Sequence, residues 1–346
     1  MEDRIAVGVL GATGTVGQKL VQLLDGHPWF RLAEVGASGL SAGHTLGELV
    51  SEDALPNQAA DLRLSSLDSK WESPIIFSAL PSGVAYDIEI NLAEIGHLVV
   101  SNASAHRMHS DVPLLIPEIN SNHLKMVDDQ PWGGGLVTNP NCAVAGLALA
   151  LAPLNQAFGI ERVITTSFQA ISGAGKPGPS AGIILDNILP FINGEEEKLA
   201  QEPQKILGHF NEGILDTANF FVSASCTRVP VSDGHLLSVS VSLAGSPSLK
   251  LVTEALQDFE VPEVVRGLPT SPDSALQVIK DEDRPQPRFD RDIGNGMTVT
   301  VGRVRPCEVL DVKFFVLSHN LLRGAAGAAL LNAELCRAKG VSTGLI

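Results

Sequence analysis

Three glycines at three-residue spacing follow the first apolar run of the chain and constrain its fold more than any other feature. Residues 4–10 read RIAVGVL, and they lead into GATGTVG at 11–17 and then into the helix-periodic segment 18–24. Such glycines let the backbone turn sharply and approach a pyrophosphate at a helix N-terminus. We therefore predict a nucleotide-binding turn rather than a tight turn without a ligand. Its expected cofactor contacts are Gly11, Thr13, Gly14, Thr15, Val16 and Gly17.

Short apolar runs separated by helical stretches continue through the first third of the chain. The runs are residues 31–37, 74–80, 98–101 and 136–138, and residues 86–95 read as a helix between two of them. This strand–helix alternation predicts a Rossmann-type doubly wound parallel sheet, with helices on both faces.

The residue pattern of the sequence changes after Asn141. Residues 162–171 and 221–231 are long strand-like runs, and apolar residues alternate with serine in 237–243. Strict alternation indicates a sheet with one buried and one polar face. We expect an α+β catalytic and dimerisation domain with a largely antiparallel sheet, whose serine face lies in solvent or at a subunit contact.

The last segment, 321–339, reads as one long helix that opens with small residues at 324–328. We expect it to pack back on the first domain. The predicted division is 1–138 with 318–346 for the nucleotide-binding domain and 139–317 for the catalytic domain.

Charge and cysteine content exclude several classes of protein. The formal charge is −15 and no long run of Lys or Arg occurs, which argues against nucleic acid and anionic membranes as partners. The four cysteines lie far apart without a metal-binding spacing, so neither a metal site nor a disulfide framework is expected. The first residues, MEDR, do not resemble a secretory signal, and no apolar stretch reaches 18 residues. We expect a cytoplasmic enzyme.

The end of the second apolar run bears on the choice of dinucleotide. An acidic residue there would bind a ribose 2′-hydroxyl, and a small or basic pocket would accept a 2′-phosphate. The residues that follow are ASGLSAG at 37–43, with Glu34 set back inside the run. Ser38 and Ser41 favour NADP, and because no Lys or Arg accompanies them, NAD stays possible.

The second chemical motif is Asn139-Pro140-Asn141-Cys142, which runs directly into an apolar helix. A cysteine at a helix N-terminus is exposed to the macrodipole and to free backbone N–H groups, which lower the pKa of a thiol. The same N–H groups can hold an oxyanion. We predict that Cys142 is a nucleophile rather than a buried helix-cap cysteine.

A thiolate needs a proton partner, and His235 is the strongest of nine histidines because it lies in a turn just after a strand. Arg228, seven residues earlier, is placed to bind a carboxylate through two guanidinium N–H groups. A surface ion pair is the alternative for Arg228.

Taken together, these motifs resemble those of the aspartate-β-semialdehyde dehydrogenases, most closely the archaeal and fungal-type branch. The resemblance covers nearly the whole chain. It rests on GATGTVG at 11–17, SALPS at 78–82, SNASAHRM at 101–108, NPNC at 139–142, FQAISGAG at 168–175, EPQKIL at 202–207, RVPVSDGH at 228–235, GMTVTVGRVR at 296–305 and HNLLRGAAG at 319–327.

The resemblance implies a role for each matching residue. Cys142 would be the nucleophile, His235 the acid/base, Gln169 the amide that orients the substrate, and Asn141 a second oxyanion donor. Arg228 would bind the substrate carboxylate and Glu202 its ammonium, and Arg107 and Lys205 would bind phosphate. Further cofactor contacts would come from Ser82, Gly173 and Asn320. On spacing alone, Glu202 and Lys205 read as a solvated helix pair.

The implied reaction is the NADP- and phosphate-dependent interconversion of L-4-aspartyl phosphate and L-aspartate-4-semialdehyde through a Cys142 thioester, in the biosynthesis of lysine, methionine and threonine. The family forms homodimers or homotetramers. The chain departs from the family pattern at Ala143, at Thr227, and at Leu40 and His44, where a basic residue is common. The last two changes also keep NAD possible.

Three other functions fit part of the sequence. An N-acetyl-γ-glutamyl-phosphate reductase would leave Glu202 without an ammonium to bind. A malonyl-CoA reductase lacks the Asn-Pro-Asn-Cys signature. A non-enzymatic NADP sensor of the short-chain dehydrogenase type would leave that signature unexplained, and the single tyrosine, Tyr86, lacks the lysine four residues later that catalytic members use.

Overall fold

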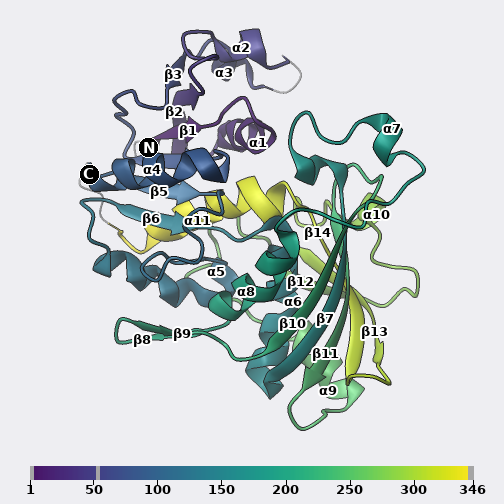
Figure 1. The fold of residues 1–346 in the computed structure, drawn as a ribbon. Helices are drawn as coiled ribbons and strands as arrows, with labels where there is room; N and C mark the ends of the chain where they lie inside the picture. The colour runs from purple at the N-terminus through teal and green to yellow at the C-terminus, as the bar shows by residue number, and fades with distance from the viewer. Residues whose placement is uncertain (1–3, 52–54, 342–346) are drawn as a thin grey trace.

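The computed structural model describes residues 4–51 and 55–341 (Figure 1). Residues 1–3, on which the expectation about a leader partly rests, and residues 342–346 of the predicted first domain lie outside the described residues.

Six parallel strands form the first sheet, in the order β3-β2-β1-β4-β5-β6. This order confirms the doubly wound sheet. It reverses direction between β1 and β4, and ligands of such sheets bind beyond the carboxyl ends of the strands at this point. The strands are β1 (Ile5–Leu10), β2 (Phe30–Ala37), β3 (Leu64–Ser66), β4 (Ile75–Ser78), β5 (Leu98–Ser101) and β6 (Gly135–Thr138).

The longer helices of this half follow the two strands that flank the reversal. Helix α1 (Thr15–Leu24) begins beyond β1, and α4 (Ser82–Glu94) begins beyond β4. Shorter helical segments connect the other strands. They are α2 (Leu46–Leu49), α3 (Asn57–Ala60), α5 (Pro117–Asn120) and the 3₁₀ segment η2 (Ser121–Asp129).

The second sheet has the order β10-β7-β11-β14-β13-β12, and its three central pairs are antiparallel. The outer pairs, β10 with β7 and β12 with β13, are parallel, so the sheet is mixed but largely antiparallel as predicted. Its strands are β7 (Ile160–Gln169), β10 (Phe221–Arg228), β11 (His235–Leu243), β12 (Leu276–Ile279), β13 (Val299–Pro306) and β14 (Val312–Ser318).

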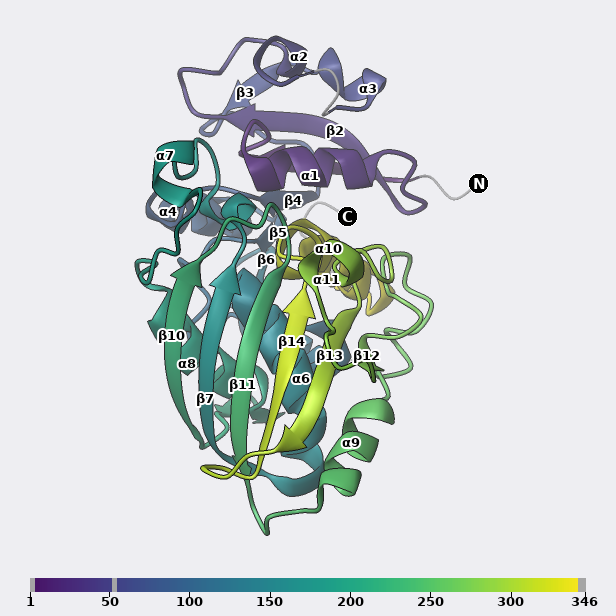
Figure 2. The ribbon, with the colours of Figure 1, turned by 90° about the vertical axis from the view of Figure 1, so that its right-hand side faces the viewer.

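Helices cover one face of the second sheet. Figure 2 shows the strands toward the viewer, with α6 (Cys142–Phe158) and α8 (Glu195–Ile206) behind them. The remaining elements are η3 (Ile171–Ala174), α7 (Ala181–Ile184), the hairpin β8 (His209–Asn211) and β9 (Ile214–Asp216), α9 (Leu249–Gln257) and α10 (Pro287–Asp290).

The C-terminal segment is not the single helix that its sequence suggested. A π-helical turn, η4 (Leu322–Ala326), precedes α11 (Gly327–Ala338). Arg323 of this turn is 1% exposed, lies 2.7 Å from the buried carboxylate of Glu118, and donates from Nε to the Met297 carbonyl. Since removal of one member of a buried ion pair strands the other charge, this pair ties the turn firmly to α5.

Two large apolar clusters make up most of the core. One joins the first sheet to the last helix, from Val7 to Leu335, and the other lies between α6 and the second sheet. A few side chains cross the predicted division at 138/139 and 317/318: Met297 packs in the first cluster and Leu114 in the second. The domain limits themselves stay a prediction.

Within residues 4–51 and 55–341, no helix is both long enough and apolar enough to cross a membrane.

Candidate active site

Cys142 is the first residue of α6, and Asn141 caps that helix. The Asn141 Oδ1 accepts hydrogen bonds from the backbone N–H of Ala143 at 2.9 Å and of Val144 at 3.3 Å. An asparagine favours the N-cap because its side-chain oxygen satisfies N–H groups that have no partner within the helix. The motif NPNC therefore holds the sulfur at the positive end of a 17-residue helix.

His235, the first residue of β11, faces this sulfur. Its Nε2 lies 3.2 Å from the Cys142 Sγ, and its Nδ1 accepts a hydrogen bond from the Ala170 backbone N–H at 3.0 Å. Because Nδ1 is an acceptor, the neutral imidazole carries its proton on Nε2. The side chain that the sequence singled out is thus a fixed hydrogen-bond donor aimed at the sulfur.

The surroundings of the pair act against the thiolate–imidazolium form, although the sequence favours a thiolate and Cys142 itself is only partly buried. Burial raises the pKa of the Cys142 thiol, and the neighbouring Glu195 carboxylate raises it further, against the opposite effect of Arg107, Arg228 and Lys198. Burial also lowers the pKa of His235, to about 3. Desolvation disfavours the charged form of both groups, and at Cys142 it opposes the effect of the helix N-terminus.

Two carboxamides beside the nucleophile share one carboxylate. The Nδ2 of Asn141 lies 2.9 Å from both oxygens of Glu195, and the Nε2 of Gln169 lies 3.1 Å from Oε2. The Asn141 nitrogen thus points toward Glu195 while its oxygen caps the helix. The role as a second oxyanion donor, which the family implies, stays a prediction that rests on the other N–H of this nitrogen.

Glu202, of α8, is tied to the NPNC loop. Its Oε1 pairs with the Arg107 Nη1 at 2.9 Å, and its Oε2 accepts from the Asn141 backbone N–H at 2.7 Å. The Arg107 Nη2 donates to the Asn102 carbonyl, while its buried Nε has no hydrogen-bond partner among the described residues. These contacts fix the Arg107 guanidinium beside the NPNC loop.

Lys205, for which the family implies phosphate binding, donates to backbone carbonyls in this structure. Its Nζ donates to the carbonyls of Arg107, His109 and Val112, each at 2.7 Å, and its side chain is buried. An ammonium has three N–H donors, and all three are used. Lys205 shapes the loop that carries Arg107.

Arg228 and Gly173 lie on the other side of the pair. Arg228 ends β10, is buried, and donates from Nη1 to the Ala170 carbonyl at 2.8 Å. A Cβ at Gly173 would lie 2.9 Å from both this Nη1 and the His235 Cε1. The loop after β7 therefore passes so close to both side chains that a side chain at position 173 would displace Arg228 or His235.

The C-terminal segment also reaches the nucleophile. A Cβ at Gly324 would lie 2.7 Å from the Cys142 Cβ, so the π-turn packs its backbone directly on this residue. Asn320 accepts from the Gly234 N–H at 2.8 Å and donates to the Ser172 Oγ at 2.8 Å. It thereby joins the loop before His235 to the loop that contains Gly173.

The glycine turn has the close contacts that a pyrophosphate cradle requires. Gly11 has a φ of +73°, and a Cβ on Gly17 would come within 2.1 Å of the Gly11 carbonyl oxygen. Thr13, Thr15 and Val16 complete the turn and the start of α1, which has no acidic residue in its first turn. An anion at this helix N-terminus meets free N–H groups and no opposing carboxylate.

The loop after β2 contains Ser38 and Ser41, and a cation reaches it from elsewhere. Arg63, just before β3, donates from Nη1 to the Gly43 carbonyl at 3.0 Å. Ser82 begins α4 and its Oγ lies 2.7 Å from the Ser104 Oγ. These residues lie near the carboxyl ends of β2 and β4, on the side of the glycine turn.

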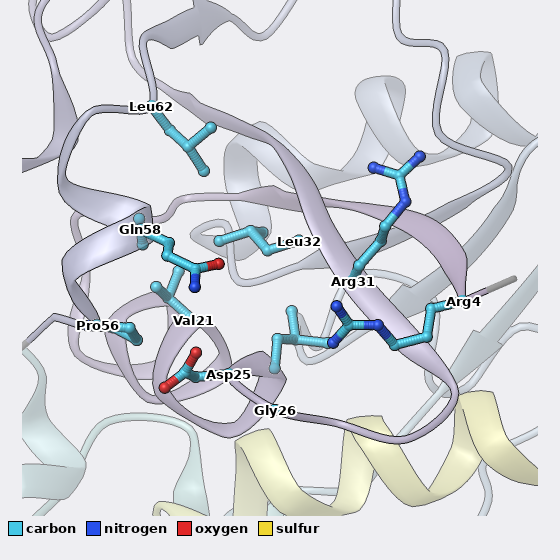
Figure 3. Close-up of a pocket in the computed structure, with 11 residues that line it drawn as sticks. Arg4, Val21, Asp25, Gly26, Arg31, Leu32, Pro56, Gln58 and Leu62 are labelled. Carbon is cyan, nitrogen blue, oxygen red and sulfur yellow. The ribbon is translucent and has the colours of Figure 1, made fainter. Parts of the chain in front are cut away.

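A pocket of about 290 Å³ lies at the opposite end of α1 (Figure 3). Arg4, Arg31, Asp25 and Gln58 are among its lining residues. It faces the amino ends of β1 and β2, so it is separate from the glycine turn and from Cys142. Among the described residues, no group of three or more His, Cys, Asp or Glu side chains is arranged to hold a metal ion.

Sequence reasoning missed three residues near the expected site: Glu195, Lys198 and Arg63. Glu195 and Lys198 stand in the acidic run GEEEK, which reads as a solvated helix start. Arg63 is some 20 residues from the loop that it contacts. No local signal marks any of the three, because each depends on a contact between distant segments.

Two family models match the chain. The model described as the NAD-binding domain of semialdehyde dehydrogenase matches residues 6–127, and the model described as the semialdehyde dehydrogenase dimerisation domain matches residues 151–323.

Relatives in other organisms match over almost the full length. An aspartate-semialdehyde dehydrogenase of Archaeoglobus fulgidus is 48% identical over 96% of this chain and 98% of its own, and that of Saccharomyces cerevisiae is 40% identical over 98% and 99%. A crystal structure of the Candida albicans enzyme with NADP has a TM-score of 0.90 at 40% identity, covering 97% of this chain and 99% of that one. The enzyme of Vibrio cholerae complexed with ASA has a TM-score of 0.78 at 25% identity, with the same coverage.

The resting protonation state predicts a pH profile. Because the pKa of the Cys142 thiol is raised, its thiolate fraction grows only at alkaline pH. We expect the rate of Cys142 alkylation by iodoacetamide to keep rising beyond about pH 9. The pKa of Cys307 is lowered, chiefly by the Leu310 N–H, so the measurement uses a Cys307→Ser background, with Cys142→Ser as the blank. A plateau below neutral pH would instead indicate a thiolate–imidazolium pair.

Proposed function

The chain belongs to the aspartate-semialdehyde dehydrogenase family, and from this premise we propose how its residues carry out the NADP- and phosphate-dependent interconversion of L-4-aspartyl phosphate and L-aspartate-4-semialdehyde. The contact between the Cys142 Sγ and the His235 Nε2, at the start of α6, is the observation that carries the proposal. The matches to aspartate-semialdehyde dehydrogenases confirm the family resemblance inferred from the sequence. They give no support to the three other functions.

NADP is the cofactor, and the glycine turn fits its pyrophosphate. Gly11 and Gly17 leave no room for side chains, and the N-terminus of α1 supplies the free N–H groups. Ser38, Ser41 and the Arg63 guanidinium are placed to meet the 2′-phosphate. Gly173 and Asn320, which border the His235 side chain and its loop, lie where the nicotinamide must reach the Cys142 thioester. When bound, the cofactor supplies or accepts the hydride.

The cations of the site bind the negatively charged groups of the substrate. Arg228 binds the α-carboxylate, since it is buried within reach of His235 and Cys142. Arg107 binds the phosphoryl group, as the family resemblance implies. Lys198, whose charge also acts on Cys142, takes the place that the family pattern gave to Lys205. Glu202 keeps Arg107 in place and offers negative charge to the substrate ammonium.

In the biosynthetic direction, the Cys142 sulfur attacks the acyl carbon. The S–C bond forms and the C–O bond to phosphate breaks, and the proton that the thiol loses ends on the expelled phosphate. After hydride arrives at the thioester carbon, the C–S bond breaks and the aldehyde leaves. The electron pair returns to the sulfur, which takes a proton from solvent.

His235 assists both steps as a neutral donor. The Ala170 N–H occupies its Nδ1, so a second proton on the ring would meet another N–H. A neutral imidazole with a lowered pKa can polarise a carbonyl oxygen through its remaining N–H. The Nε2–H of His235 and the backbone N–H of Cys142 therefore stabilise the oxyanion, while Gln169 orients the substrate amine.

The chain works as a homodimer, paired through the face of the second sheet that no helix covers. This face carries exposed apolar side chains such as Ile164, together with the serines of β11, among them Ser240. The match to a dimerisation domain over residues 151–323 supports this arrangement. Two such dimers can form a tetramer.

The first test is phosphate-dependent reduction of NADP by the purified protein with L-aspartate-4-semialdehyde. We expect turnover that needs phosphate and is lost in Cys142→Ser, because no other group supplies the thioester. N-acetylglutamate semialdehyde serves as the control substrate. Turnover with the acetylated substrate alone would move the chain to the arginine-pathway reductase, and NADP binding without turnover would favour the sensor.

A pair of variants separates donation from proton abstraction at His235. Glutamine can place an amide N–H near the position of the imidazole Nε2, whereas alanine cannot. We expect His235→Ala to lower kcat by about 1000-fold and His235→Gln by about 10-fold, which is the scale for losing one oxyanion donor and for weakening it. Single-turnover measurements give both values. Equal losses would show that a proton acceptor is required and would contradict the donor role.

The dimer face is tested by mass in solution. Ser240 pairs with Ile164 on one side and Lys313 on the other, so Ser240→Arg adds bulk and like charge at the centre of the face. We expect this variant to run as a monomer in size-exclusion chromatography with light scattering. Leu251→Lys on α9 is the control, and it should keep the mass of the parent protein. A parent protein that is itself monomeric overturns the proposal.

A further inference from the structure

Glu195 is a buried carboxylate that the reaction scheme above does not use. It is the first residue of α8, is 7% exposed, and receives three side chains. The Asn141 Nδ2 donates to both of its oxygens at 2.9 Å, the Gln169 Nε2 to Oε2 at 3.1 Å, and the Lys198 Nζ to Oε1 at 2.9 Å. A carboxylate with this many donors holds each of them in a defined direction.

Glu195 is charged despite its burial. Desolvation raises its pKa, but the Lys198 ammonium and the two amide donors outweigh this effect and leave the pKa below its ordinary value. Its place in the first turn of α8 also favours negative charge. At neutral pH it therefore accepts hydrogen bonds only and donates none.

An acceptor without a proton decides which way each carboxamide points. Asn141 must turn its nitrogen toward Glu195, and this leaves its oxygen for the Ala143 and Val144 N–H groups that begin the helix of the nucleophile. If the amide were reversed, two oxygens would face each other and two N–H groups would lose their acceptor.

The same logic applies to Gln169, which is 1% exposed. One of its N–H groups faces the Ser167 Oγ at 3.3 Å and the other faces Glu195. The amide oxygen is the end that remains for the substrate. An oxygen acceptor suits the ammonium of an α-amino acid, whereas a nitrogen donor would repel it.

We propose that Glu195 is a positioning residue, which fixes the Asn141 carboxamide as the cap beneath Cys142 and turns the Gln169 oxygen toward the substrate ammonium. The part that concerns substrate rests on the proposed function, and the part that concerns Cys142 does not.

The position of Glu195 also affects the pKa of the Cys142 thiol, and this effect makes the proposal testable. The Glu195 carboxylate disfavours the thiolate, and after burial it is the largest cause that raises the pKa of the Cys142 thiol. Replacing Glu195 by glutamine therefore changes two properties in opposite directions. The thiol becomes easier to ionise, while one of the two oxygens that accept from the carboxamides becomes an NH2 donor.

The experiment compares Glu195→Gln with Glu197→Gln. Glu197 lies in the same turn of α8 and carries the same charge, but its side chain is exposed. For Glu195→Gln we expect kcat/KM for L-aspartate-4-semialdehyde to fall by about 100-fold, the scale for a misplaced reacting group. The KM for NADP should stay within about twofold of the parent value, because the glycine turn is distant from α8. Glu197→Gln should match the parent protein.

A second measurement needs no substrate. In the Cys307→Ser background, the pH profile of Cys142 alkylation should move to lower pH in Glu195→Gln and stay in place in Glu197→Gln. General misfolding would also expose Cys142 and move the profile to lower pH. It would raise the KM for NADP as well, so a shift at an unchanged KM for NADP is the result that supports the proposal.

The possible outcomes distinguish the role of Glu195 from the proposed function. Activity of Glu195→Gln within threefold of Glu197→Gln, or an alkylation profile that does not move, overturns the role of Glu195. If the parent protein does not turn over aspartate semialdehyde, the proposed function fails, while a shifted alkylation profile still supports the contact between Glu195 and the Cys142 site. Should Glu195→Gln fail to fold, Asn141→Asp tests the same contact: the repulsion of two carboxylates should move the profile to higher pH, and an unmoved profile overturns the role.

Discussion

The packing of the Gly324 backbone on Cys142 is the constraint on which the rest of this structure depends. A side chain at Gly324 would collide with the nucleophile, so the π-turn of the C-terminal segment sets how far the start of α6 can move. The same turn is anchored by the buried pair of Arg323 and Glu118. Because α11 then packs in the core of the first sheet, the nucleophile and the dinucleotide turn share one rigid support.

Around that support, the site contains buried and partly buried charged side chains that form ion pairs. Arg107 pairs with Glu202, and Lys198 pairs with Glu195. Each carboxylate also accepts a hydrogen bond from Asn141, through its backbone N–H in one case and its carboxamide in the other. Charges taken out of water are tolerated only when paired and hydrogen-bonded. The result is a nucleophile held between positive and negative groups, ready for a substrate that carries both signs.

Much of this could be predicted from local patterns. The glycine turn after the first strand and the capped cysteine of NPNC are short segments whose chemistry and conformation are decided by neighbours in the chain. The contacts that local patterns do not predict are long-range. Lys205 and Asn141 match the family motifs, and the structure adds that Lys205 donates to backbone carbonyls and that Asn141 donates to Glu195. A motif identifies a residue but not the partners that use up its hydrogen bonds.

The sequence by itself determined the parallel sheet, the glycine turn after the first strand and the place of Cys142 at a capped helix start, since periodicity, glycine spacing and helix capping act over a few residues. Only the tertiary structure decided how these parts work together. The approach of Gly324 to Cys142 spans some 180 residues and that of Glu195 to Asn141 spans 54. The pKa of the thiol was likewise raised by burial. Desolvation and hydrogen-bond saturation depend on everything that surrounds a group, and that surrounding exists only once the chain has folded.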